Sequence, residues 1–287
     1  NLNLPRPKHP LISWINVSEI DCSTAENSRP QFTDFYVISI KKGIKEPITY
    51  GQSQYDFDKG IMFFVAPRQV VSGGGANDEG WMLLIHPDFL QGYPLANQIK
   101  EYGFFSYATD EALHLSEEEE KTMESVLKKL RQEYQSPIDE YSQDIMIAHI
   151  ELLLTYSNRF YNRQFISRKP ENNRLLTQLN RLLDDYFAGD YARDNGLPNV
   201  QFFARELAVS PDYLSDMLRS LTGKSTQHHI HDKLIETAKE KLSITDLSVS
   251  EIAYHLGFEH SQSFSRLLKN KTGLSPTEFR KSVMDKV

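Results

Sequence analysis

Two stretches of the chain repeat one pattern, LSDMLRSLTGKS at residues 214–225 and FSRLLKNKTGLS at residues 264–275. The matching positions are Leu214, Ser215, Leu218, Thr222, Gly223 and Ser225 in the first stretch and Phe264, Ser265, Leu268, Thr272, Gly273 and Ser275 in the second. A shorter match lies before each stretch, FARELA at 203–208 and IAYHLG at 252–257. Each copy therefore predicts a short helix, a tight turn and a second helix that ends at a glycine, which is the arrangement of a helix-turn-helix motif.

The residues around the turns support this prediction. In the first copy, Ser210 is suited to cap the second helix, Pro211 to occupy its first position, and Gly223 to follow its last residue. Ala204 and Ala253 are small enough to let the two helices of each motif approach closely. A plain helical hairpin repeat also needs small residues and leucines, but it does not require the turn positions to match as well.

The second copy extends into a longer signature. The stretch SEIAYHLGFEHSQSFSRLLKNKTGLSPTEFR at 250–280 resembles the AraC family of bacterial transcription regulators, at Gly257, Phe258, Phe264, Arg266, Lys269, Gly273, Pro276 and Arg280. The resemblance implies an all-α DNA-binding domain over 171–287. It implies two helix-turn-helix motifs joined by one long helix, which corresponds to residues 225–242.

The resemblance also implies which side chains face double-stranded DNA. In the second motif Phe264, Leu267 and Leu268 share the buried side of the helix, which leaves Ser261, Gln262, Ser265, Arg266 and Lys269 toward DNA, with Lys271 suited to a phosphate. Glutamine pairs bidentately with adenine and arginine with guanine. The first motif presents Asp212, Ser215, Asp216 and Arg219. Its two carboxylates repel phosphates unless they accept hydrogen bonds from cytosine N4, so base contact by this motif is left open.

The length of the linking helix suits two adjacent grooves. A helix of about 18 residues spans roughly 27 Å. This length is close to the roughly 34 Å that separate successive major grooves on one face of DNA. We therefore expect one chain to contact two groove segments.

The N-terminal half predicts strands followed by helices. FYVISI at 35–40, DFDKGIMFFVAP at 56–67 and WMLLI at 81–85 are short apolar segments separated by turn residues, as in an antiparallel β-barrel or jelly roll. The stretches FDKGIMFFVAP and LLIHPDFL resemble the cupin-like regulatory domain of the same family. The expected fold class is α+β, with a regulatory and dimerisation domain over 1–166.

Two long helices are expected after the strands. Residues 116–134 open with a serine cap and an acidic first turn, then repeat apolar residues at helical spacing. The helix over about 138–166 is apolar on more than one side, with Ile145 and Leu152 opposite Ile147 and Leu154. A homodimer through this helix is one interpretation; packing on both the barrel and the neighbouring helix is the other.

Whole-chain properties limit the function. The net charge is −7, yet residues 255–287 hold six Lys or Arg against three acids, so the basic character lies at the second motif. The apolar runs are far shorter than the roughly 20 residues that span a bilayer, and no membrane partner is expected. No signal peptide is visible, and the single Cys22 fits a reducing compartment, so we expect a cytoplasmic protein.

An apolar pocket for a small-molecule effector is expected in the barrel, at Tyr36, Ile38, Phe64 and Trp81. The alternative for each of these side chains is that it fills the barrel core. No catalytic residue, cofactor or metal site is expected, because the barrel segment offers only His86 as a histidine ligand. His228, His229 and His231 fall on the linking helix, where packing or exposure is the simpler reading.

The sequence thus predicts a non-enzymatic, sequence-specific transcription regulator controlled by a small-molecule effector. A metal-dependent cupin enzyme fused to a DNA-binding tail is one alternative. A regulator controlled by a protein partner is another. Neither the effector, nor the operator, nor the sign of regulation follows from the sequence.

Overall fold

The computed structural model describes residues 9–16, 31–42, 49–50, 53–54, 60–71 and 79–284. The chain divides into two compact units, Asn1–Ser167 and Arg168–Val287. Cys22 and most of the glycine-rich stretch at 73–80 lie outside the described residues. No helix within the described ranges is long and apolar enough to cross a lipid bilayer.

The N-terminal unit is built on an antiparallel sheet with the strand order β1-β8-β3-β6-β9. Its strands are β1 (Ile12–Asn16), β3 (Tyr36–Lys42), β6 (Ile61–Val65), β8 (Glu79–Ile85) and β9 (Leu113–His114). Two further pairs join β2 (Gln31–Phe32) to β7 (Val70–Val71) and β4 (Thr49–Tyr50) to β5 (Ser53–Gln54). The three apolar segments expected to be strands thus form β3, β6 and β8, while closure into a cupin-like barrel or jelly roll stays a prediction.

Short helical turns follow the strand β8. They are η3 (Pro87–Leu90), α1 (Leu95–Gln98), η4 (Ile99–Glu101), η5 (Gly103–Ser106) and η6 (Thr109–Glu111). Phe104 and Phe105 in η5 are buried and pack on Phe64 of β6, with ring centroids 4.5 and 5.6 Å away. This irregular segment therefore completes an aromatic core beside the sheet.

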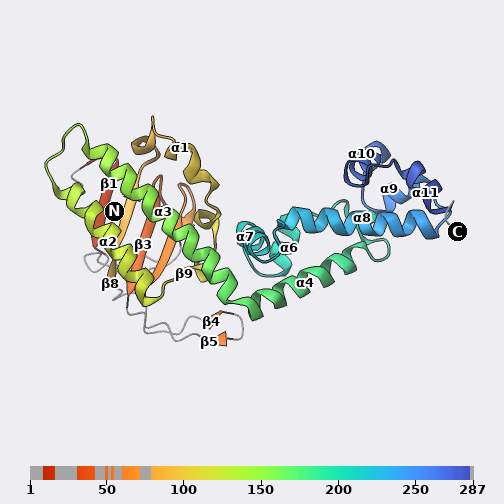
Figure 1. The fold of residues 1–287 in the computed structure, drawn as a ribbon, viewed down its shortest axis with the longest axis horizontal. Coiled ribbons are helices and arrows are strands. Elements are labelled where there is room, and N and C mark those ends of the chain that lie inside the picture. Colours follow the sequence, from red (N-terminus) through yellow and green to blue (C-terminus); the bar gives the residue numbers. More distant parts are fainter. Residues whose placement is uncertain are drawn as a thin grey trace. The chain divides into compact units, whose positions relative to one another are not determined.

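Two long helices, α2 (Glu117–Gln135) and α3 (Ser142–Ser167), run side by side across one face of the sheet (Figure 1). The serine cap expected for α2 is present and forms part of a capping box. Ser116 Oγ accepts a hydrogen bond from the Glu119 backbone N–H, and the Glu119 carboxylate accepts one from the Ser116 backbone N–H. Gln164 of α3 accepts a hydrogen bond from His114 N at 2.8 Å and donates one to Ala112 O at 3.1 Å. These bonds fix α3 against the edge of the sheet.

The C-terminal unit is wholly helical over its described residues. Its helices are α4 (Lys169–Phe187), α5 (Tyr191–Asn195), α6 (Val200–Glu206), α7 (Pro211–Thr222), α8 (Thr226–Ile244), α9 (Val249–His255), α10 (Ser261–Thr272) and α11 (Pro276–Met284). Pro170 lies in the first turn of α4, where its missing N–H costs no hydrogen bond. The pairs α6–α7 and α9–α10 are the two repeats, and α8 is the helix that links them.

Both motifs pack against α8. Along this helix, α7 lies at its beginning, α11 packs toward its end, and α4 runs beside it (Figure 1). Leu214 and Phe264, the matching residues of the repeat, are both fully buried, as are Ala204 and Ala253 to within 1%. The repeat therefore marks two equivalent small cores on one helical support.

Candidate nucleic-acid interface

The first recognition helix, α7, forms as its sequence predicts. Ser210 Oγ accepts a hydrogen bond from the Tyr213 backbone N–H, and Gly223 closes the helix in the left-handed conformation at φ 74°. Tyr213, Leu214, Met217 and Leu218 are buried. The opposite side of α7 therefore faces solvent.

The four residues expected to contact DNA from α7 lie on that solvent side, and two of them bind each other. Arg219 donates a hydrogen bond to the Asp216 carboxylate at 2.6 Å, one helical turn away. Asp212 is exposed and Ser215 is half-buried, with its Oγ 3.1 Å from Thr226 Oγ of α8. The only arginine on this face is thus neutralised by a neighbouring acid.

The second recognition helix, α10, presents a different surface. Phe264 and Leu268 are fully buried, while Gln262, Arg266 and Lys269 are exposed on the opposite side. Leu267, expected to be buried, is only half-buried. Arg266 forms no ion pair within the described part of the chain, so its guanidinium can donate to a base edge or a phosphate.

Ser261 and Ser265 lie at the edge of this surface. Both are half-buried, and Ser265 Oγ donates a hydrogen bond to the Ser261 carbonyl at 2.9 Å. At about 100° per residue, Lys271 lies on the side of α10 opposite Gln262. Burial, and after it the positive charge of Lys271, lower the pKa of His231 on α8.

The linking helix keeps the two recognition helices apart. Its 19 residues span about 28 Å. This length agrees with the separation expected from the sequence and suits two successive major grooves. Arg280 of α11 donates hydrogen bonds to Leu242 O at 3.2 Å and Leu247 O at 2.5 Å, and so fastens the second motif to the end of α8.

The residues at the two ends of α5 also contact the second motif. Gly257, at the turn between α9 and α10, has φ +87°, and a Cβ there would lie 2.6 Å from the Gly196 carbonyl carbon. His255 Nδ1 also lies 3.3 Å from a carboxylate oxygen of Asp190. Both contacts require α5 and the second motif to lie close together. The position of the second motif is therefore fixed by α5 as well as by α8.

Lys233 of α8 also makes a contact between helices. Its Nζ forms ion pairs with Asp184 of α4 and with Glu236, at 2.5 and 3.1 Å. The hydrogen bond with Asp184 is the main reason that the pKa of Lys233 is raised. A polar recess of about 350 Å³ borders this pair between α4 and α8, and its other lining residues are Asn180, Leu183, His229 and Asp232.

The three histidines of α8 have separate surroundings. His229 is half-buried with its Nε2 3.0 Å from Thr222 Oγ, and burial followed by the Lys224 charge lowers its pKa. His228 is exposed, with Nδ1 2.8 Å from Ser225 Oγ. No group of three or more metal-binding side chains occurs among the described residues.

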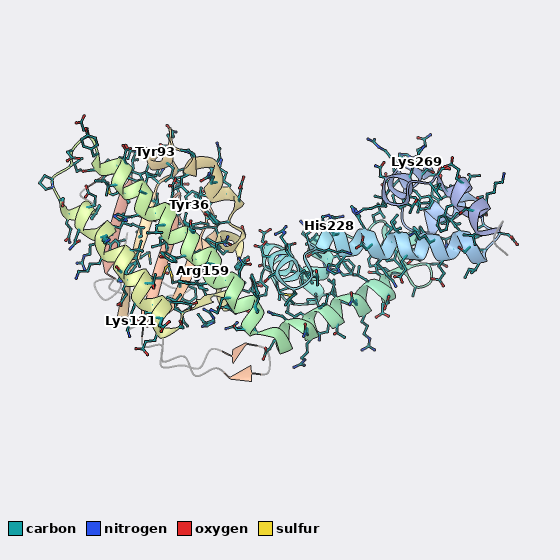
Figure 2. All side chains as sticks on the ribbon, viewed as in Figure 1. Tyr36, Tyr93, Lys121, Arg159, His228 and Lys269 are labelled. Atoms are coloured by element: carbon teal, nitrogen blue, oxygen red, sulfur yellow. The ribbon has the colours of Figure 1, made fainter. Side chains whose placement is uncertain are left out.

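The four residues expected to line an effector pocket share one face of the sheet. Ile38 lies opposite Leu83 and Phe64, and directly opposed residues point to the same side. Tyr36, which Figure 2 labels, lies on this side too, and its ring centroid is 5.1 Å from that of Phe105. The ring of Phe64 lies 6.1 Å from Tyr161 of α3, so this is the face that the helices cover.

Three of these four side chains, Tyr36, Ile38 and Phe64, are buried in the layer between sheet and helices. Trp81 is half-buried and stacks on Trp14 at 4.5 Å. The sequence did not indicate which face of each strand the helices would cover, because strands of this apolar character have two similar faces. The opposite face carries Val37, Ser39, Phe63, Val65, Met82 and Leu84.

The chain is similar to known regulators. A family model described as a helix-turn-helix domain matches residues 203–282. The arabinose operon regulatory protein of Escherichia coli (strain K12) is 29% identical over 147 residues, which are 51% of this chain and 47% of that protein. The uncharacterized transcriptional regulatory protein YesN of Bacillus subtilis (strain 168) is 36% identical over 95 residues, which are 31% of this chain and 26% of that protein.

Among solved structures, the C-terminal domain of AraT, a response regulator from Geobacillus stearothermophilus, is 28% identical, with a TM-score of 0.34 over 38% of this chain and 84% of that one. The chain spans about half or less of the length of the two curated relatives. The family match covers α7, α8 and α10 together, and these carry the repeat, the linking helix and the exposed arginine described above. Residues 203–282 therefore form a helix-turn-helix domain.

Proposed function

We propose that the protein is a sequence-specific, DNA-binding transcription regulator that contacts two successive major grooves with α7 and α10. The observation that carries this proposal is the pair of recognition helices held by one α8 of about 28 Å, α7 packing on its beginning and α10 joined to it through α9 and α11. Of the two helices, α10 supplies most of the affinity, because Arg266 is unpaired within the described residues whereas Arg219 is held by Asp216.

DNA selection tests this proposal. The full chain is incubated with a random duplex library, bound duplexes are amplified over several rounds, and the binding of the enriched duplex is measured by fluorescence anisotropy. We expect an enriched site with two short elements about one helical turn apart. Enrichment of a single element would assign base reading to one motif. Failure to enrich any sequence would contradict sequence-specific binding.

The proposal includes a homodimer formed through α3. Tyr141, Ile145 and Leu152 are 61, 40 and 43% exposed, and they continue with the exposed Ala148 at alternating spacings of four and three residues. Such a spacing forms one apolar stripe along a helix, and a second copy of α3 would remove it from water. Opposite this stripe, Ile147, Ile150 and Leu154 are already buried within the unit.

Sedimentation equilibrium on the full chain tests the dimer. We expect twice the monomer mass for the wild type and the monomer mass for Leu152→Asp, because a carboxylate at the centre of the stripe cannot be buried without a large desolvation cost. Asn158→Asp, an exposed position of α3 outside the stripe, is the matched control and should remain dimeric. A wild-type chain that sediments as a monomer would contradict this part of the proposal.

The N-terminal unit is proposed to bind a small-molecule effector. Three of the side chains first expected to line the site pack between sheet and helices, and the opposite sheet face supplies further apolar and hydroxyl groups. A thermal-shift screen of small metabolites on the full chain tests this, because a ligand that binds only the folded state raises the melting temperature. If no small metabolite raises the melting temperature but an added protein does, the result would favour control by a protein partner instead.

A further inference from the structure

A group of basic and amide side chains lies between the two recognition helices. It consists of Lys224, which precedes α8, of Gln227, His228 and His231 on the first turns of α8, and of Lys271 on α10. We call these five residues the bridging surface. Of these five residues, only Lys271 was among those expected to contact DNA. The other four have no role in the proposed contacts of α7 and α10.

Contacts at both ends place this surface between the motifs. Ser215 of α7, on the side of that helix expected to face DNA, lies 3.1 Å from Thr226 in the first turn of α8. At the other end, the charge of Lys271 on α10 acts on His231 and on Asp232. Figure 2 shows His228 on the same side of α8 as Lys269, which projects from α10.

The charge of the bridging surface suits a polyanion. Asp232, a carboxylate beside it, is paired with Lys224 at 2.6 Å, so these two charges compensate each other and the charge of Lys271 remains. The side-chain amide of Gln227 lies 2.9 Å from Nε2 of His231, and both Gln227 and His228 are exposed. Amide, imidazole and ammonium groups all donate hydrogen bonds to phosphate oxygens.

When two helices of one chain enter successive major grooves, the DNA backbone crosses the space between them at the intervening minor groove. We propose that the bridging surface binds phosphates of this crossing segment, with the rings of His228 and His231 among the hydrogen-bond donors. The inference rests on the proposed DNA-binding function. It adds a third contact with DNA, which touches no base but fixes the position of α7 and α10 along the duplex.

Protonation makes this contact depend on pH. In the free protein the pKa of His231 lies below its ordinary value, because of burial first and then the charges of Lys271 and His228, with Asp232 acting in the opposite direction. A phosphate placed beside the ring favours the charged form and raises the pKa in the complex. The complex then binds more protons than the free chain, so affinity for DNA rises as pH falls from about 8 through 6.5.

Anisotropy titrations with the selected duplex test the inference on the full chain. We expect the wild type to bind about tenfold more tightly near pH 6 than near pH 8, and the double variant His228→Gln, His231→Gln to lose most of this difference. The slope of log affinity against log salt near pH 6 should fall by about one to two in the variant, as expected for one or two lost phosphate contacts. Thermal melting of the variant checks that it is folded.

Two controls separate this surface from other histidines. His149→Gln on α3 and His260→Gln at the start of α10 should keep the pH dependence of the wild type. A second probe replaces the phosphates between the two half-elements by uncharged methylphosphonates. This modified duplex should bind the wild type more weakly than the unmodified duplex does. The loss should be smaller for the double variant, which keeps Lys224 and Lys271 but lacks the two imidazoles.

Three results would overturn the inference. They are a double variant with the pH dependence of the wild type, loss of that dependence in His260→Gln instead, and equal sensitivity of wild type and double variant to methylphosphonates. In each of them the wild type still binds its selected duplex, so the proposed function stands. A wild type that binds no duplex at all would instead contradict the proposed function.

Discussion

Arg266 and Lys269 lie one turn apart on the exposed side of α10, yet their chemistry differs. A guanidinium can donate two parallel hydrogen bonds to guanine O6 and N7, whereas an ammonium is a compact charge that suits a phosphate. Since neither is paired with an acid in the described part of the chain, both are available to DNA. The two residues therefore separate base recognition from backbone affinity.

Arg266→Ala should cost about 1–3 kcal/mol in binding free energy on the selected duplex and relax base preference at one position. Lys269→Ala should weaken cognate and unrelated duplexes by a similar factor and reduce the salt slope by about one. Competition titrations with single-base variants of the duplex measure both effects. An Arg266→Ala variant with unchanged base preference would remove α10 from the reading role.

Asp216→Asn should strengthen DNA binding by the first motif. The change releases Arg219 from its ion pair and removes one carboxylate from a face expected to meet phosphates. Because exposed ion pairs contribute only about 0–1 kcal/mol, the fold should be little affected. We expect a severalfold gain in affinity for unrelated duplexes by anisotropy, with Asp185→Asn on α4 as the control of equal charge change. A loss of affinity for the selected duplex alone would show that Asp216 accepts a hydrogen bond from cytosine.

At the scale of single elements, the turn between α9 and α10 is the most constrained feature. Gly257 combines a left-handed backbone with close contact to the Gly196 carbonyl group, while Gly223 and Gly273 share the left-handed backbone and have open space around them. The glycines at the ends of the recognition helices thus terminate helices. Gly257 also allows the end of α5 to pack closely against the second motif.

Gly257→Ala should therefore destabilise the C-terminal unit more than Gly223→Ala does. Both substitutions incur the cost of a left-handed alanine, about 1–2 kcal/mol. Only the first also places a Cβ within 2.7 Å of the Ala192 and Gly196 carbonyl oxygens. Urea unfolding of the two variants measures the difference, and equal losses in unfolding free energy would mean that the close contact does not persist in solution.

The helix α8 should also make stability depend on pH. The folded-state pKa values of His229 and His231 lie below the ordinary value, in each case through burial first. The unfolded chain therefore takes up protons at a higher pH than the folded one, and stability is lost as pH falls through about 6.5 toward the folded pKa values. Thermal melts between about pH 8 and pH 5 should show this decline, and His229→Gln should reduce it.

At the scale of the whole molecule, regulation requires that effector and DNA influence each other's affinity. The coupling between two binding sites is reciprocal, so the selected duplex should change the affinity for effector by the same factor by which effector changes the affinity for DNA. Titration calorimetry of the full chain with an effector from the screen, with and without duplex, measures this factor. Equal effector affinities in both titrations would contradict allosteric control even if DNA binding were confirmed.

The C-terminal motifs could be predicted from sequence because their signals are local. A serine cap, a proline in the first turn, buried residues at helical spacing and a terminal glycine all act within about a dozen residues, and α7 formed where these signals place it. The exposed side of α10 follows from the same spacing. The AraC-type signature added the assignment of these helices to DNA.

Other features depended on contacts between segments far apart in the chain. The approach of Gly257 to Gly196 and the position of Lys271 beside α8 follow from helix packing, which no periodicity encodes. The same holds for Tyr36, Ile38 and Phe64. Their apolar character determined that they would be buried, but only the covering of one sheet face by α2 and α3 decided that they lie between sheet and helices, because an apolar strand can bury either face.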